Sequence, residues 1–165
     1  MKSLDRDQFA QLLKQARVKP RLMRELRFVP EEITDWEDRE LLAVTTRSGN
    51  EGVLLIQLDE LYVLPYQFSG RIADSQTGRS KAITCDFCYT WQRGSNAGTI
   101  TFDGQEGHSF SFLCCGDLDC SLHVRNKTAA ATLSRSQLHE DLTAEQRIER
   151  LRERLGKVLL TVIHQ

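Results

Sequence analysis

Four cysteines in the sequence are arranged as two pairs at the spacing of metal ligands. Cys85 and Cys88 form a Cys-x-x-Cys turn, and Cys115 and Cys120 follow as a second pair. Such a turn lets two thiolates face one point, and four thiolates complete the tetrahedral site of a structural zinc ion. Ordinary buried cysteines or a redox pair are the alternatives, but cytosolic proteins seldom collect cysteines at this spacing without a metal. The spacing therefore predicts one structural Zn²⁺ held by these four residues.

A fifth cysteine leaves the identity of the third ligand open. Cys114 and Cys115 are adjacent, and neighbouring side chains of an extended segment point to opposite faces, so only one of them should bind the metal. We expect Cys114 to be the spare. Imidazole is also a common zinc ligand, so His108, His123 and His139 are further candidates, although four thiolates make them unnecessary.

The predicted site and the remaining motifs favour binding over catalysis. A closed site of four protein ligands has no position for the water that zinc enzymes activate. The sequence also lacks the Gly-x-Ser-x-Gly, His-Glu-x-x-His, P-loop and dinucleotide-binding motifs. An enzyme that uses Asp117, Asp119 or Glu106 with a histidine is an alternative, but no acid is paired with a base at a diagnostic spacing. We therefore expect a binding protein and not an enzyme.

Two residues beside the predicted ligands are candidates for contact with a partner. Phe87 lies inside the first cysteine pair, and Arg125 follows the second pair. Aromatic residues and arginine are enriched at the centres of protein interfaces. Packing in the core is the alternative for both. We predict that Phe87 and Arg125 face the partner.

The segment that contains the cysteines predicts a treble clef. Residues 99–102 and 108–113 are strand-like runs that flank a glycine-rich turn, so they predict a hairpin between the two cysteine pairs. A knuckle, a hairpin and then a cysteine that opens a helix occur in this order in treble-clef fingers. Residues 69–80 are rich in serine, glycine and charge and predict a loop, where we place a candidate subdomain boundary.

The N-terminal part predicts two short helices followed by strands. Apolar residues recur at helical spacing over residues 9–16, and Pro20 suits the first turn of a second helix that should end before Pro30. From Leu41 onward, two aliphatic and β-branched runs flank a Gly/Asn turn and predict a hairpin. Pro65 lies in a third run and cannot donate to a ladder, so that strand should lie at an edge or end there.

The C-terminal segment predicts one long amphipathic helix. Thr143 and Gln146 have the spacing of a capping box. An apolar stripe follows, formed by Ile148, Leu151, Leu155, Val158 and Val162. The arginines that alternate with Glu149 and Glu153 should lie on the outer faces and form i,i+4 ion pairs. These arginines are Arg147, Arg150, Arg152 and Arg154.

Composition and charge narrow the possible partners. The chain has 165 residues, 40% hydrophobic and 27% charged, which is ordinary for a folded protein. No stretch approaches the roughly 20 apolar residues of a membrane span, and the N-terminus has no signal-peptide core, so we expect a cytoplasmic protein without a membrane partner. Residues 1–30 hold eight Lys/Arg and three Asp/Glu. This bias suits an acidic partner or nucleic acid, but we interpret it as the solvated face of a helix. Residues 81–127 hold four Lys/Arg and five Asp/Glu, which disfavours nucleic acid as a partner of the finger.

Taken together, the elements predict an α+β protein with short N-terminal helices, a small antiparallel sheet, a treble-clef zinc finger and a long C-terminal helix. We divide it into an N-terminal helical segment, residues 1–30, and an α+β domain, residues 31–165, whose finger spans about residues 81–130.

Several strings resemble the elongation-factor-G-binding proteins, the fusidic-acid-resistance or FusB-type family. They run from Trp36-Glu37-Asp38-Arg39 through Cys85-x-x-Cys88 and Leu113-x-Cys115-x4-Cys120-Ser121-Leu122-His123-Val124-Arg125 to Leu138-His139-Glu140 and the terminal helix. The resemblance covers most of the chain. It favours Cys115 over Cys114 as the third ligand, because the family pattern is Cys-x4-Cys.

The resemblance implies a treble-clef domain that binds elongation factor G and, in the resistance members, helps the factor leave a ribosome stalled by fusidic acid. No catalytic residues come with it. The resistance proteins carry a larger N-terminal helical bundle, whereas this chain has only residues 1–30 before its sheet. We therefore expect a housekeeping version of the same binding module at least as much as a drug-resistance protein. An RNA-binding zinc module and a zinc-thiol redox sensor are the alternative functions.

Overall fold

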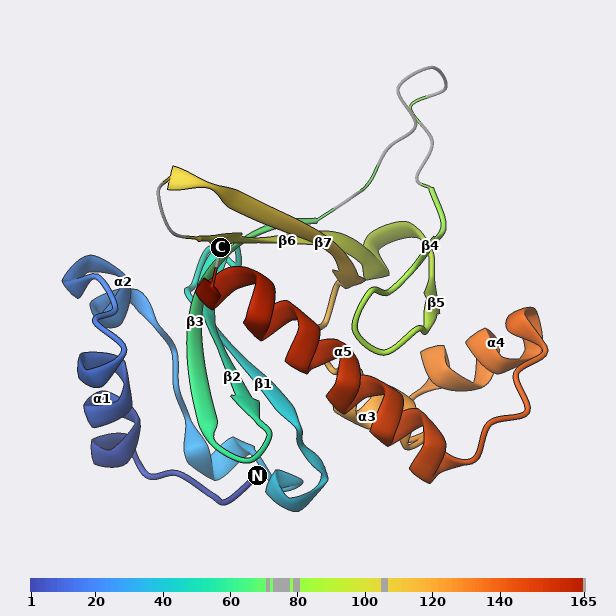
Figure 1. Cartoon of the computed structure of the whole chain (residues 1–165), viewed down its shortest axis with the longest axis horizontal. Helices are drawn as coiled ribbons and strands as arrows, with labels where there is room; N and C mark the ends of the chain where they lie inside the picture. The colour runs from blue at the N-terminus through green and yellow to red at the C-terminus, as the bar shows by residue number, and fades with distance from the viewer. Residues whose placement is uncertain (71, 73–77, 79–80, 105–106, 165) are drawn as a thin grey trace.

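A computed structural model describes residues 1–70, 72, 78, 81–104 and 107–164 of the chain and shows one five-stranded antiparallel sheet with helices on both faces (Figure 1). The strands of this sheet are β1 (Leu41–Thr45), β2 (Glu51–Gln57), β3 (Leu61–Gly70), β6 (Ala97–Asp103) and β7 (Ser109–Cys115), in that spatial order. A small second sheet pairs β4 (Ile83–Thr84) with β5 (Trp91–Gln92). The predicted α+β class is confirmed.

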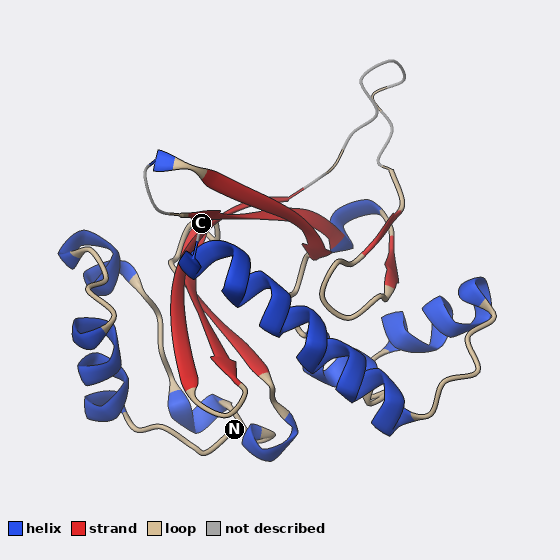
Figure 2. Cartoon of the chain, viewed as in Figure 1, coloured by secondary structure: helices blue, strands red, loops and turns tan. Residues whose placement is uncertain are grey.

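Within the described residues, five α-helices surround the sheet (Figure 2). They are α1 (Arg6–Gln15), α2 (Pro20–Glu25), α3 (Cys120–Val124), α4 (Ala129–Leu138) and α5 (Ala144–His164). Short 3-10 turns lie at Pro30–Glu32, Trp36–Asp38 and Gly94–Asn96. Pro20 occupies the first turn of α2, as expected. Helix α4 was not expected from the sequence, although it has two local signals: the helix-forming residues 129–131, all alanine, and the Thr128 hydroxyl that accepts the Ala131 N–H at the helix start.

Strand β2 is buried on both faces and therefore separates two cores. Val53 and Leu55 pack in a cluster with residues of α1 and α2, while Leu54 and Ile56 pack in a second cluster with α5 and the cysteine region. Successive side chains of a strand point to opposite faces, so this continuous apolar run needs cover on both sides. Each of these fully buried side chains contributes about 1.5–3 kcal/mol to folding.

Strand β3 continues through Pro65 and lies inside the sheet, so the expectation of an edge strand or a strand end was wrong. Pro65 pairs with Val53 of β2, whereas pairing with β6 begins only at Gln67. Proline has no N–H to donate, but Pro65 is not paired with a residue of β6, so no carbonyl there is left without a donor. The second hairpin, β6–β7, joins the first one in a single sheet.

The arginines of α5 have different partners from those expected. The capping box of Thr143 and Gln146 is present, but Arg147 is buried and donates to the carbonyl oxygens of Val124 (2.9 Å) and Leu142. Within the described residues, no arginine of α5 forms an ion pair with Glu149 or Glu153. The helix is instead tied to the end of α3, because the buried guanidinium needs acceptors and finds backbone carbonyls there.

Two predictions about the organisation of the chain stay predictions. Most of residues 69–80, where we placed a candidate boundary, lie outside the described residues. The division into residues 1–30 and 31–165 is also untested, although Phe9 and Leu22 share a core cluster with Leu42 of β1. Among the described residues, no helix has the length and apolar character of a membrane span.

Candidate metal centre

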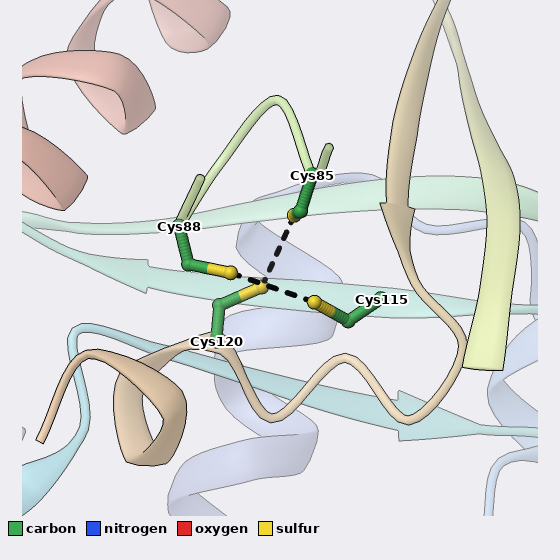
Figure 3. A group of neighbouring side chains, drawn as sticks. All are labelled: Cys85, Cys88, Cys115 and Cys120. Atoms are coloured by element: carbon green, nitrogen blue, oxygen red, sulfur yellow. Dashed lines mark hydrogen bonds between the residues drawn. The ribbon is translucent and has the colours of Figure 1, made fainter. Parts of the chain in front are cut away.

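The four predicted cysteines converge on one buried point (Figure 3). All four sulfur atoms lie within 4.8 Å of one another, and each residue is at most 2% exposed. The Sγ atoms of Cys85 and Cys120 are 3.7 Å apart, and those of Cys88 and Cys115 are 3.5 Å apart. A tetrahedral zinc ion with bonds of about 2.3 Å requires sulfur atoms about 3.8 Å apart. The four thiols are therefore positioned for one zinc ion.

The first pair of ligands lies on a tight turn between β4 and β5. The N–H of Tyr89 donates to the carbonyl of Cys85 (3.0 Å), and the N–H of Cys85 donates to the carbonyl of Thr90 (3.0 Å). Tyr89 takes up the left-handed conformation, with φ of 63°. This turn points the thiols of Cys85 and Cys88 to the same side, as a zinc knuckle does.

The second pair of ligands connects the end of β7 to the start of α3. Cys115 is the last residue of β7 and Cys120 the first of α3. Between them, the N–H of Gly116 donates to the carbonyl of Asn96 at 2.6 Å. A Cβ atom at Gly116 would lie 2.7 Å from the carbonyl oxygen of Ser95, so only glycine allows this close approach. Knuckle, hairpin and helix start thus follow the treble-clef order.

Cys114 is not part of the ligand cluster. Its side chain is fully buried in the core formed with α5, and the group of four thiols includes Cys115 instead. The expectation that Cys114 is the spare cysteine is confirmed.

Polar side chains that the sequence analysis missed lie directly behind the ligands. Gln92 is buried and its Nε2 donates to Cys115 Sγ at 3.3 Å, and the hydroxyl of Thr90 lies 3.1 Å from Cys88 Sγ. Burial raises the pKa of Cys88, but hydrogen bonds with the neighbouring thiols outweigh it and lower this pKa well below its ordinary value. A usable signal was the polar alternation of Thr90 and Gln92 directly after the knuckle, since such hydrogen bonds orient metal ligands.

Replacing Gln92 should weaken zinc binding without removing it. We expect Gln92→Leu to lower zinc affinity by about 10- to 100-fold, because Cys115 loses its donor and neighbouring hydrogen bonds typically contribute this much. Competition with a chromophoric chelator measures the change. Gln57→Leu is a matched control, since Gln57 Nε2 donates to the carbonyl of Leu58, away from the ligands. Equal zinc affinity of both variants would show that the Gln92 amide does not support the site.

The alternative catalytic residues are only partly brought together. His123 is buried, and its Nε2 lies 3.4 Å from Asp117 Oδ2. Burial lowers the pKa of His123, but the contacts with Asp117 and Cys88 raise it to about 10. Asp119 instead pairs with Arg39 at 2.9 Å, and Glu106 lies outside the described residues.

Histidines are not needed to complete the metal site. Asp117 and His123 form a second candidate group of ligands, but this group shares Cys115 with the four-thiol cluster. His108 and His139 are exposed and belong to neither group. The four thiols alone satisfy the tetrahedral geometry of one ion.

The two residues predicted to face a partner are both engaged inside the fold. Phe87 is fully buried, with its ring centroid 6.0 Å from that of Phe112, so the expectation that it is exposed was wrong. The knuckle turns this ring into the core because the surface beneath the finger is apolar. Arg125 forms a two-pronged ion pair with Glu40, with nitrogen to oxygen distances of 2.7 and 2.6 Å.

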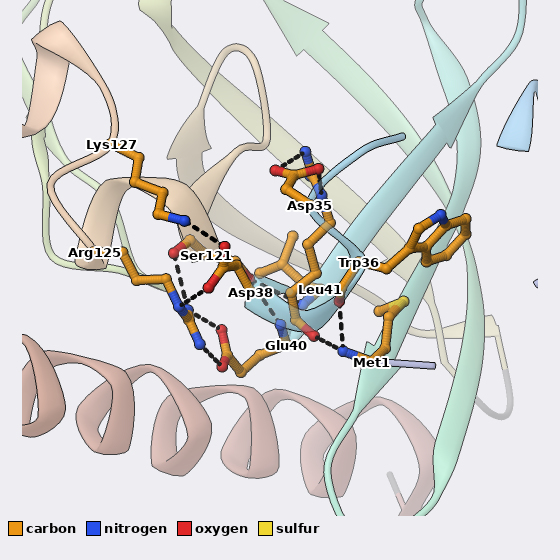
Figure 4. Close-up of polar contacts among 10 residues, drawn as sticks. Met1, Asp35, Trp36, Asp38, Glu40, Leu41, Ser121, Arg125 and Lys127 are labelled. Atoms are coloured by element: carbon orange, nitrogen blue, oxygen red, sulfur yellow. Dashed lines mark hydrogen bonds and ion pairs between the residues drawn. The ribbon is translucent and has the colours of Figure 1, made fainter. Parts of the chain in front are cut away.

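The Arg125–Glu40 pair belongs to a polar network between the end of α3 and the start of β1 (Figure 4). Asp38 lies 3.3 Å from Arg125 Nε. The hydroxyl of Ser121 accepts the N–H groups of Glu40 (2.9 Å) and Leu41 (3.1 Å). The network joins residues that are more than 80 positions apart in the sequence, so it fixes the finger against the sheet.

A buried four-thiol site between a knuckle and a helix start defines a treble-clef zinc-finger protein. The sequence matches the family described as the FBP C-terminal treble-clef zinc-finger over residues 14–162, and the chain belongs to this family. The resemblance to FusB-type proteins is thereby confirmed. The family description names a zinc finger and no reaction. No curated protein and no solved structure matches the chain.

Proposed function

We propose that this zinc finger docks on elongation factor G and favours release of the factor from the ribosome. Membership of the treble-clef family and the resemblance to FusB-type proteins support the choice of partner. The proposed role is binding and not catalysis, because a closed four-thiolate site offers no position for a reactive water. A protein with this role works in the cytoplasm, where translation takes place.

The observation that carries the proposal is an exposed aromatic side chain at the knuckle. Tyr89 is 40% exposed, and its ring lies under two guanidinium groups of α5, with centroid distances of 4.7 Å to Arg150 and 5.0 Å to Arg154. Arg154 also donates to the carbonyl of Asp86 in the knuckle (2.8 Å). The charge of Arg150 is paired with Glu140 at 2.5 Å. The knuckle and α5 together therefore hold one aromatic surface with flanking arginines in place, which we call the Tyr89 surface.

The backbone of Tyr89 adds to this argument. A residue other than glycine in the left-handed conformation costs about 1–2 kcal/mol, and such strain tends to persist at functional positions. Tyrosine and arginine are also the residue types that dominate binding at interface centres. The Tyr89 surface replaces Phe87 and Arg125 as the proposed contact.

The mechanism we propose is a shift in equilibrium. A ligand shifts an equilibrium between two states only by its difference in affinity for them. The finger must therefore bind the released form of elongation factor G more tightly than the ribosome-bound form. The alternative role of a redox sensor is less favoured, because all four thiols are buried and sensor cysteines are accessible to the oxidant.

Calorimetry with purified elongation factor G tests the proposal. We expect saturable binding to the zinc-loaded protein and an affinity about 30-fold lower for Tyr89→Asn, which corresponds to the loss of about 2 kcal/mol at a central interface residue. Asparagine tolerates the left-handed conformation, so this change removes the ring and spares the turn. Leu160→Asn is the control, since Leu160 is 61% exposed on α5 beyond the Tyr89 surface.

The possible outcomes separate the partner from the surface. Absence of binding by the unchanged, zinc-loaded protein would exclude elongation factor G as the partner. Binding that is equally strong for Tyr89→Asn and the unchanged protein would retain the partner and exclude the Tyr89 surface.

A further inference from the structure

Helices α1 and α2 carry positive charge on the side of the sheet away from α5 and the finger (Figure 1). Five exposed cations there have no ion pair or side-chain hydrogen bond within the described residues. They are Lys14, Arg17, Lys19, Arg24 and Arg47. We call this set the basic strip. Because none of these five side chains is engaged in an ion pair with another described residue, they are available to an anionic ligand.

Part of the basic strip surrounds a groove. An open groove of about 700 Å³ is lined by Arg24 to Arg27, at and just beyond the end of α2, and by Arg47 and Ser48 on the β1–β2 turn. The lining includes the Glu25 carboxylate, which is paired with Arg21 at 3.3 Å. Of the three arginines in the lining, Arg27 has an acidic partner, Glu32, at 3.4 Å, and both of those side chains are more than 60% exposed. Three arginines and one glutamate from two chain segments therefore line one open site.

Backbone contacts hold the two chain segments that carry these arginines together. The N–H of Arg27 donates to the carbonyl of Thr45 (3.0 Å), and Leu26 and Thr46 form a β-bridge. The hydroxyl of Thr46 lies 3.0 Å from that of Ser48 and donates to the carbonyl of Glu51. The turn that carries Arg47 is thus fixed before any ligand binds, which lowers the entropy lost on binding.

We propose that the basic strip and its groove bind the phosphate backbone of RNA. A guanidinium group donates two parallel hydrogen bonds to a phosphate, and a run of cations suits a ligand with regularly repeated charge. None of the large hydrophobic side chains exposed on the described surface lies in this region, whereas a helix that binds a membrane surface needs them. The choice of RNA rests on the proposed function, because release of a factor from the ribosome takes place beside ribosomal RNA.

Binding of a fluorescent single-stranded RNA to the full, zinc-loaded chain tests this proposal. We expect the logarithm of the affinity to fall with the logarithm of salt concentration with a slope of about −2, as for three phosphate contacts at about −0.7 each on single strands. The double variant Arg24→Glu/Arg47→Glu should lower the affinity for the RNA by at least about tenfold. The magnitude of the salt slope should fall by about 1 to 2. Both side chains are exposed, so the changes should not affect folding.

A charge-matched control and a competitor make the result decisive. Arg93→Glu/Arg135→Glu changes two exposed arginines near the finger and should leave RNA binding unchanged. Equal loss in both double variants, a slope near zero, or displacement of the RNA by polyglutamate at equal charge would overturn the proposal. The last result would assign the strip to an acidic polypeptide.

The two proposals fail separately. Arg24→Glu/Arg47→Glu should keep its affinity for elongation factor G, and Tyr89→Asn should keep its affinity for RNA. Loss of RNA binding in Tyr89→Asn would place the RNA on the finger and overturn the assignment to the basic strip. Absence of factor binding with intact RNA binding would overturn only the proposed function.

Discussion

Cys115→Ala is expected to abolish stable zinc binding and unfold the finger, whereas Cys114→Ala should retain one zinc ion per chain. A structural zinc ion contributes about 10–16 kcal/mol of apparent binding free energy, and this free energy stabilises the folded finger. The four ligands belong to the same core cluster as Leu151 and Leu155 of α5, so the loss should spread from the finger to the packing of α5. The adjacent cysteines form a matched pair with similar burial.

Metal analysis and thermal unfolding measure the difference between these variants. Cys114→Ala removes one buried sulfur and should lower stability by about 1 kcal/mol. Chelation of zinc from the unchanged protein should reproduce the Cys115→Ala phenotype. Lowering the pH should do so too, because the four thiols must lose their protons to bind the ion. If Cys114→Ala lost zinc and Cys115→Ala kept it, our assignment of the third ligand would be reversed.

Arg125→Met is expected to lower the free energy of unfolding by about 3 kcal/mol, because it leaves the Glu40 carboxylate buried without its main partner. The side chains of Arg125 and Glu40 are only 14% and 8% exposed, and the substitution keeps most of the apolar stem of the arginine. Denaturant unfolding monitored by circular dichroism measures the change. The Arg125→Met variant also tests whether Arg125 has a structural role or contacts the partner, as the sequence suggested.

A double variant provides the control for this prediction. Glu40→Gln/Arg125→Met removes both charges, so it should recover a large part of the lost stability, as replacement of a whole buried ion pair often does. Folded Arg125→Met should bind elongation factor G with unchanged affinity. A drop in that affinity with normal stability would restore Arg125 as a contact residue.

The metal site was predictable because the two cysteines of each ligand pair lie close together in the sequence, at a spacing typical of metal ligands. Cys85 and Cys88 lie on one turn, and a thiolate in such a turn has few roles other than metal binding or redox chemistry. The capping box at Thr143 and the position of Pro20 in α2 are similar cases. In each, the residues that form the local motif lie at most five positions apart, whereas the fold brings the two cysteine pairs together across 27 to 35 positions.

The surface of the finger was not predictable in this way. Phe87 and Tyr89 are two aromatic residues in one turn, yet Phe87 is buried and Tyr89 is exposed. Which ring is buried depends on the apolar core beneath the knuckle and on Arg150 and Arg154, which come from a helix far along the chain. Local patterns show that an aromatic residue is present, but not which neighbour covers it.

The sequence was enough to predict two cysteine pairs at ligand spacing, the two hairpins, the α+β class and the long terminal helix, whereas the choice between Cys114 and Cys115 rests on the grouping of the four thiols in the structure. The joining of the hairpins in one sheet through β3 and β6, the burial of Arg147 and the pairing of Arg125 with Glu40, 85 residues away, became visible only in the folded chain. The difference lies in the range of the forces involved. Turn chemistry, capping and ligand spacing act between near neighbours, whereas burial and ion pairing depend on which distant segments the packed core brings together.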